Sequence, residues 1–112
     1  MPTNTQSRAA NYIVKGVETV VAGRDIQARI FTLAPGEIIP WHSHSEITDY
    51  FFVLSGRLIV ETRAPDDHHA LGPGDRYQVA AGTSHQTANR EASDCRFLII
   101  QGVGKYDWIK EG

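Results

Sequence analysis

The sequence predicts an all-β protein of the sandwich or barrel type, on two observations. Short runs rich in β-branched and aromatic residues alternate with turn signals such as Pro35-Gly36, Ser55-Gly56 and Pro73-Gly74, and many short strands at close spacing are typical of these folds. In addition, no segment shows the sustained apolar period of about 3.6 residues that marks an amphipathic helix. A layer of helices is therefore not expected.

The first three expected strands are separated by two turns. Residues 12–22 and 26–33 are rich in Val, Ile and Thr, and Gly23-Arg24-Asp25 lies between them. Pro35-Gly36 then forms a tight turn into a strand at 39–44, because glycine accepts backbone conformations that a side chain would hinder.

The later strands are bounded in the same way. Ser55-Gly56 turns the chain between strands at 49–54 and 57–62. The next turn signals are Pro65-Asp66-Asp67, Pro73-Gly74-Asp75 and Ala81-Gly82-Thr83, and the strands that follow are predicted at 68–71, 76–80, 84–88 and 95–101. The first residues and the tail after Gly104 are expected to be less ordered.

Length and composition favour one small domain in the cytoplasm. A chain of 112 residues forms one core and is too short for two, so we expect a single domain over 1–112 with its core at 26–101. The net charge is −2 without a basic cluster, which argues against a nucleic-acid partner, and no apolar run could span a membrane. The polar N-terminus lacks a secretion signal, and Cys95 is the one cysteine, so an intrachain disulfide is impossible.

Histidine spacing provides the first indication of function. His42 and His44 lie two residues apart, and on a strand such residues point to the same face. Two surface histidines on an edge strand would be the simpler explanation. A third imidazole from His85 and a carboxylate from Asp49 would instead complete the shell of a first-row metal ion.

The spacings around these residues resemble the two motifs of the cupin superfamily. The first half is G-x5-H-x-H-x4-D-x6-G from Gly36 to Gly56, and the second is G-x5-A-x-G-x2-H-x3-N from Gly74 to Asn89. The family has Glu where Asp49 stands and Pro where Ala80 stands. The resemblance covers about half the chain and implies a double-stranded β-helix, or jelly-roll, barrel.

The resemblance also implies the ligand set. It assigns His42, His44 and His85 to the metal and places Asp49 at the carboxylate position. Because Asp is one methylene shorter than Glu, Asp49 could bind directly, reach the metal through water, or accept a hydrogen bond from a ligand imidazole. Three histidines with an open position suit Zn, Fe, Ni or Mn.

Two function classes remain open from the sequence. One is a metalloenzyme acting on a small organic molecule, like the cupin dioxygenases, isomerases and cyclases. The other is a module that binds a small molecule without turning it over. Proton transfer needs a titratable group near the metal, and the candidates are few: Asp49, Glu46, Tyr77 and the rings of His68 or His69. Redox chemistry at iron needs no such base, so the dioxygenase type is favoured among the enzymes.

Strand 49–54 is apolar on both faces, which predicts a homodimer. If Asp49 points inward, alternation places Phe51 and Val53 beside it as walls of a cavity. Tyr50, Phe52 and Leu54 then face outward, and residues 97–100 repeat the pattern. An apolar outer face marks a contact surface, and single-domain cupins are often dimers. Alternatively, the N-terminal strand 12–21 could cover this face within one chain.

Overall fold

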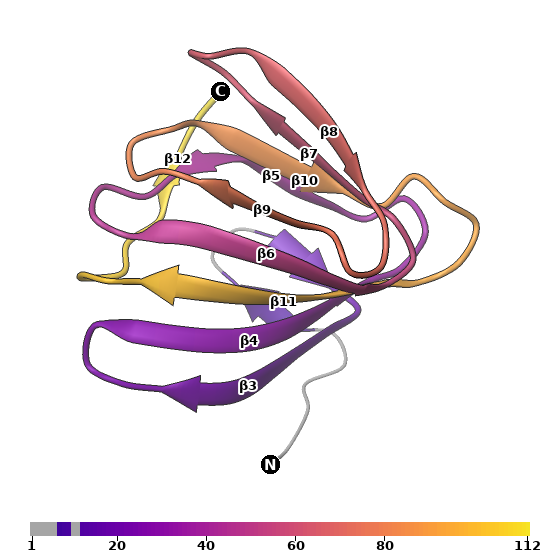
Figure 1. Ribbon diagram of the computed structural model, residues 1–112, viewed down its shortest axis with the longest axis horizontal. Coiled ribbons are helices and arrows are strands. Elements are labelled where there is room, and N and C mark those ends of the chain that lie inside the picture. The colour runs from indigo at the N-terminus through magenta and orange to yellow at the C-terminus, as the bar shows by residue number, and fades with distance from the viewer. Residues whose placement is uncertain (1–6, 10–11) are drawn as a thin grey trace.

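The computed structural model describes residues 7–9 and 12–112, and these form β-strands and no helix. Two five-stranded antiparallel sheets face each other around one core, and β1 (Ser7–Ala9) and β2 (Tyr12–Val14) form a separate hairpin (Figure 1). The described residues thus contain no helix able to cross a membrane.

The first sheet has the strand order β3-β4-β11-β6-β9. Its members are β3 (Gly16–Ala22), β4 (Ile26–Leu33), β11 (Cys95–Gly102), β6 (Thr48–Ser55) and β9 (Arg76–Val79). The second sheet has the order β12-β5-β10-β7-β8. Its members are β12 (Ile109–Lys110), β5 (Ile38–Ser43), β10 (His85–Ala88), β7 (Leu58–Thr62) and β8 (Asp67–Leu71). The chain changes sheet at every connection from β4 to β7 and again at every connection from β8 to β11, so the predicted double-stranded β-helix is confirmed.

Alternation of side chains builds the core, as predicted. In β6, Asp49, Phe51 and Val53 are buried, whereas Leu54 is exposed. In β11, Phe97 and Ile99 are buried and the residues between them are less so. The inward apolar residues of both sheets form one cluster, in which Phe31 stacks on Phe97 with ring centroids 5.6 Å apart.

Most predicted strands agree with the structure to within one residue at each end. The exception is 12–22, which breaks at Lys15 into β2 and β3. The Lys15 backbone N–H donates to Glu37 Oε1 (2.9 Å), and its ammonium group pairs with Asp94 (2.5 Å). The chain bends there because β2 pairs with β1, whereas β3 pairs with β4 and forms the edge of the first sheet.

One alternative raised by the sequence and one expectation are wrong. Strand β3 extends the first sheet sideways and does not cover the outer face of β6 and β11. The segment after Gly104 is not a loose tail: it forms β12, which pairs with β5, and places Trp108 against the core. The prediction for the first residues falls outside the described part of the chain.

Candidate metal centre

The structure brings the four predicted ligands together inside the barrel. His42 lies on β5, His44 directly follows that strand, His85 begins β10 opposite His42, and Asp49 lies on β6 of the other sheet. All four residues are buried, and one potential ligand atom from each lies within 4.8 Å of the others. Long-range strand pairing therefore converts two distant sequence motifs into one site.

Gly82 helps to position His85 relative to His44. Its φ of 81° lies in the left-handed region, where a residue with a Cβ is strained. In this conformation the Gly82 N–H donates to the backbone carbonyl of His44 (2.7 Å). The turn before β10 is thus fastened to the end of β5.

Each imidazole is oriented by a backbone carbonyl. Nδ1 of His42 lies 2.7 Å from the Pro40 carbonyl, and Nδ1 of His85 lies 2.9 Å from the Thr83 carbonyl. Nδ1 of His44 bonds in the same way to the carbonyl of Asp107 (2.5 Å). Because a carbonyl can only accept, each Nδ1 is the donor, and each Nε2 is left to face the interior.

The Nε2 atoms converge on the carboxylate of Asp49. Oδ2 of Asp49 lies 2.8 Å from Nε2 of His85 and 3.4 Å from Nε2 of His44. The His44 contact is not aligned as a hydrogen bond, so that buried Nε2 has no partner. Lone pairs of Asp49 and His85 can lie this close only when a proton or a metal cation sits between them. Three imidazoles and a carboxylate form a donor set that suits a first-row divalent metal, so the residues fit the group that the sequence predicted.

Burial and charge shift the pKa values within the site. Burial lowers the pKa of His42 to about 3, and the neighbouring His85 adds to the effect. Burial also lowers the pKa of His44, but the Asp49 carboxylate outweighs it and leaves the pKa above the ordinary value. For Asp49, burial raises the pKa, yet contacts with His44 and His85 hold it well below the usual range. Asp49 is therefore a carboxylate and His42 a neutral ring near neutral pH.

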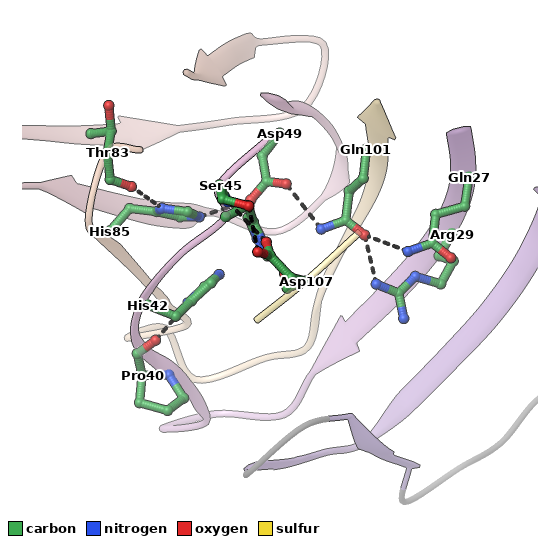
Figure 2. A network of polar contacts seen from close by, with 11 residues as sticks. Gln27, Arg29, Pro40, His42, Ser45, Asp49, Thr83, His85, Gln101 and Asp107 are labelled. Atoms are coloured by element: carbon green, nitrogen blue, oxygen red, sulfur yellow. Dashed lines mark hydrogen bonds and ion pairs between the residues drawn. The ribbon is translucent and has the colours of Figure 1, made fainter. Parts of the chain in front are cut away.

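A row of hydrogen bonds leads away from Asp49 across three strands of the first sheet (Figure 2). Gln101 lies directly opposite Asp49 on β11 and donates from Nε2 to Asp49 Oδ1 (2.9 Å). Its Oε1 accepts from Gln27 Nε2 (3.0 Å) and from Arg29 (2.6 Å), both on β4. The carboxylate is thus held by a side-chain network as well as by the imidazoles.

Aromatic residues from the chain ends close the site. The ring of Trp108 stacks on His42 with centroids 3.7 Å apart, and Tyr12 packs against Trp108 at 5.1 Å. Tyr106 lies 5.3 Å from the ring of His44. The carboxylate of Asp107 accepts hydrogen bonds from the backbone and hydroxyl of Ser45 and fixes this segment. The cavity left beside Asp49 and His42 has a volume of about 20 Å³, which is room for about one water molecule.

Of the other candidate residues, Phe51 lines this cavity and the rest lie away from it. Phe51 lines it as predicted, but Val53 packs into the apolar core instead. Glu46 accepts a hydrogen bond from the backbone of Lys105 (3.0 Å), and Tyr77 packs against His69 at 4.3 Å. None of the proton-transfer candidates other than Asp49 lines the cavity formed by the described residues.

Several residues of the site were missed from the sequence: Tyr12, Gln27, Arg29, Gln101, Tyr106 and Trp108. For three of them a signal was present. Gln101 follows Phe97 and Ile99 in the inward alternation of β11, and Gln27 and Arg29 precede Phe31 on β4. Polar side chains at inward positions indicate a polar partner in the interior.

The comparisons with known proteins agree with this fold. The family model described as "Cupin domain" matches residues 29–101, and no curated protein matches the chain. One similar structure is an uncharacterized conserved protein with a double-stranded beta-helix domain from Klebsiella pneumoniae, with 20% identity over 96% of this chain and 91% of that one (TM-score 0.74). KdgF from Halomonas sp. has 21% identity over 82% and 80% of the two chains (TM-score 0.72).

A recombinant oxalate oxidase in complex with glycolate is also similar. It shares 16% identity over 77% of this chain but only 46% of its own length, with a TM-score of 0.70. At these identities the structural likeness shows a common fold alone.

Proposed function

The chain belongs to the cupin domain family, and from that premise we propose that it is a cytoplasmic metalloprotein that acts on a small organic molecule. It would bind one divalent transition metal ion through His42, His44, His85 and Asp49. The observation that carries the proposal is the convergence of four buried donor residues, three of which are imidazoles whose Nδ1 atoms are already hydrogen-bonded to carbonyls. The one cysteine, Cys95, is buried and free, which fits a reducing compartment.

Iron, zinc, nickel and manganese all suit this donor set, and we favour oxidoreductase chemistry of the dioxygenase type over isomerase or cyclase chemistry. When bound, the metal would supply Lewis acidity or a redox centre. Asp49 is the one carboxylate lining the cavity of the described residues, and burial raises the pKa of both Tyr12 and Tyr106. Since the phenols stay protonated near neutral pH, the site offers no free general base.

The alternative is a binding module that holds its ligand without reaction. The small volume of the cavity beside the donors, about 20 Å³, favours it, because an enzyme would have to admit both a substrate and a co-substrate. Steady consumption of oxygen by the iron-loaded protein with any small substrate would exclude this alternative.

Metal content is the direct test of the proposal. Protein purified without a His-tag should contain about one metal ion per chain by elemental analysis. Iron would support oxygen chemistry, whereas zinc would support Lewis-acid chemistry or binding. Replacing His42 and His44 together with alanine should abolish the metal and leave the fold intact by circular dichroism. A matched control is His68→Ala/His69→Ala on β8, outside the site. Stoichiometric metal in the first double variant would refute the assignment.

We also propose that the protein is a homodimer through the outer face of its first sheet. Ile30, Leu98 and Phe52 lie side by side across β4, β11 and β6 and are half-buried in the single chain. Such a face marks a contact surface. Light scattering should give the mass of two chains, and Phe52→Asp should halve it or cause aggregation. Ile38→Asp, at an exposed apolar position on β5 of the other sheet, is the control. A monomeric wild type would contradict the proposal.

A further inference from the structure

Arg29 brings a cationic side chain into the same cavity as Asp49 and His42. Its guanidinium group lies 5.0 Å from the ring centroid of Phe31 and 5.7 Å from that of Tyr106. Within the described part of the chain, no carboxylate forms an ion pair with it. A partly buried cation is normally paired with an anion, and Arg29 has no such partner among the described residues.

A purely structural role explains only part of this arrangement. One terminal nitrogen of Arg29 donates to Gln101 and so helps to orient the amide that holds Asp49. The rings of Phe31 and Tyr106 provide cation–π contacts to the guanidinium group. The Nε atom, however, is buried without a hydrogen-bond partner, and leaving such a donor unpaired is destabilising.

Trp108 and Thr87 add two more polar groups of the same kind. Nε1 of Trp108 and Oγ1 of Thr87 are buried without partners, and both residues line the cavity that Arg29 lines. Together with Arg29 they supply two N–H donors and a hydroxyl beside the candidate metal ligands. Unpaired donors that share a cavity with a cation indicate an acceptor that carries negative charge.

The charge of the site supports the same conclusion. Neutral imidazoles contribute nothing, Asp49 contributes one negative charge, and Arg29 contributes one positive charge. With a divalent metal bound, the cavity would therefore carry about two excess positive charges in surroundings of low dielectric constant. An anionic ligand would lower this charge, whereas a neutral one would leave it unbalanced.

We propose that the ligand of this site is a small organic acid whose carboxylate is bound by Arg29, with the rest of the molecule facing the metal centre. This rests on the proposed function, since it specifies which class of small molecule the metal site takes. A planar guanidinium group can hold a carboxylate through two parallel hydrogen bonds, and Arg29 has its Nε free for one of them.

The ligand can enter only when the C-terminal cover moves. The cavity of about 20 Å³ holds no organic molecule while Tyr106 and Trp108 are in place. These two residues lie between Gly102, where β11 ends, and Ile109, where β12 begins, in a segment without regular strand pairing. Displacing this segment would join the cavity to solvent. His42, Asp49 and His85 would keep their positions on β5, β6 and β10, whereas His44 would lose its contact with the Asp107 carbonyl.

The test compares a carboxylate with an uncharged molecule of the same shape. Zinc-loaded protein is titrated with propionate and with propionamide by ligand-observed NMR. Propionate should bind at least about tenfold more tightly, and Arg29→Gln should weaken it by about 10- to 100-fold, because hydrogen bonds to a charged group contribute about 1.5–3 kcal/mol. Arg29→Lys keeps the charge and loses the planar fork, so it should restore part of the affinity. Arg96→Gln, an exposed arginine on β11, should change nothing.

Equal affinity for the two probes, no binding of propionate, or equal propionate affinity in wild type and Arg29→Gln would each overturn the proposal. Because propionate can also coordinate zinc through its own carboxylate, both probes are compared on the metal-free protein as well, and Arg29→Lys takes the place of Arg29→Gln if that variant fails to fold. Zinc content is measured first. Failure to load zinc would refute the proposed function instead, and propionate against propionamide on the metal-free protein would then test Arg29 separately.

Discussion

Replacing Gln101 with leucine should weaken metal binding without touching a metal ligand. Gln101 is 5% exposed and links three groups: it donates to Asp49 and accepts from Gln27 and Arg29. Leucine has a similar volume and no polar atoms. The substitution therefore leaves Oδ1 of Asp49 without its side-chain donor, while the imidazoles and their carbonyl partners keep their positions.

Two magnitudes follow from this geometry. The lost hydrogen bond to an ionised, buried carboxylate should lower the free energy of unfolding of the metal-free protein by about 1.5–3 kcal/mol. Gln27 and Arg29 are half-buried, so the hydrogen bonds that they lose to Gln101 add less than the one lost by Asp49. Removing a group that orients a ligand should weaken metal affinity by about 10- to 100-fold.

Competition with a chromogenic chelator measures the affinity, and urea denaturation measures the stability. Gln86→Leu is a matched control: Gln86 Nε2 donates to Glu61 (3.3 Å) next to His85, on a partly exposed surface. It should change stability by less than about 0.5 kcal/mol and leave metal affinity unaltered. If Gln101→Leu and Gln86→Leu bind metal equally well, the row of side chains behind Asp49 has no role in holding the ion.

Three further predictions concern the site. Metal affinity should fall with decreasing pH from a point above the ordinary histidine value of about 6.5, because the raised pKa of His44 lets protons compete early; a chelator titration that is flat between about pH 6 and pH 8 would contradict this. Asp49→Asn should keep the metal but bind it about 10- to 100-fold more weakly, and an unchanged affinity would exclude Asp49 from the site. Trp108→Ala should speed the extraction of metal by EDTA, since its ring stacks on His42; an unchanged extraction rate would show that this ring does not limit access.

The sequence predicted the parts of the fold that depend on local order. Glycines at turns mark the strand ends, and Gly56 shows why: its φ is 80°, and a Cβ there would lie 2.6 Å from the Asp94 carbonyl. Alternation assigned the inward face of β6 correctly, whereas for β11 it predicted two apolar faces without deciding which of them is inward. The spacing of His42, His44 and His85 likewise identified the residues that the structure brings together.

The features that could not be predicted from the sequence depend on tertiary packing. The row from Asp49 through Gln101 to Gln27 exists because β11 pairs with β6 and β4 in one register, and no spacing along the chain encodes that register. The position of Trp108 on His42 depends on how β12 pairs with β5. Its segment has no apolar period, so a sequence pattern could not distinguish a cover from a loose end.

The division of the ligands between the two sheets has a consequence for the thermal behaviour of the protein. His42 and His85 belong to one sheet and Asp49 to the other, so a bound ion would join the two sheets at a single point. An ion that binds only the folded state stabilises it by about 4 kcal/mol at a thousandfold excess over its Kd. A partly loaded sample would then hold two populations that melt at different temperatures. Calorimetry on such a sample would show two transitions, which would merge into the upper one on adding metal and into the lower one on adding a chelator.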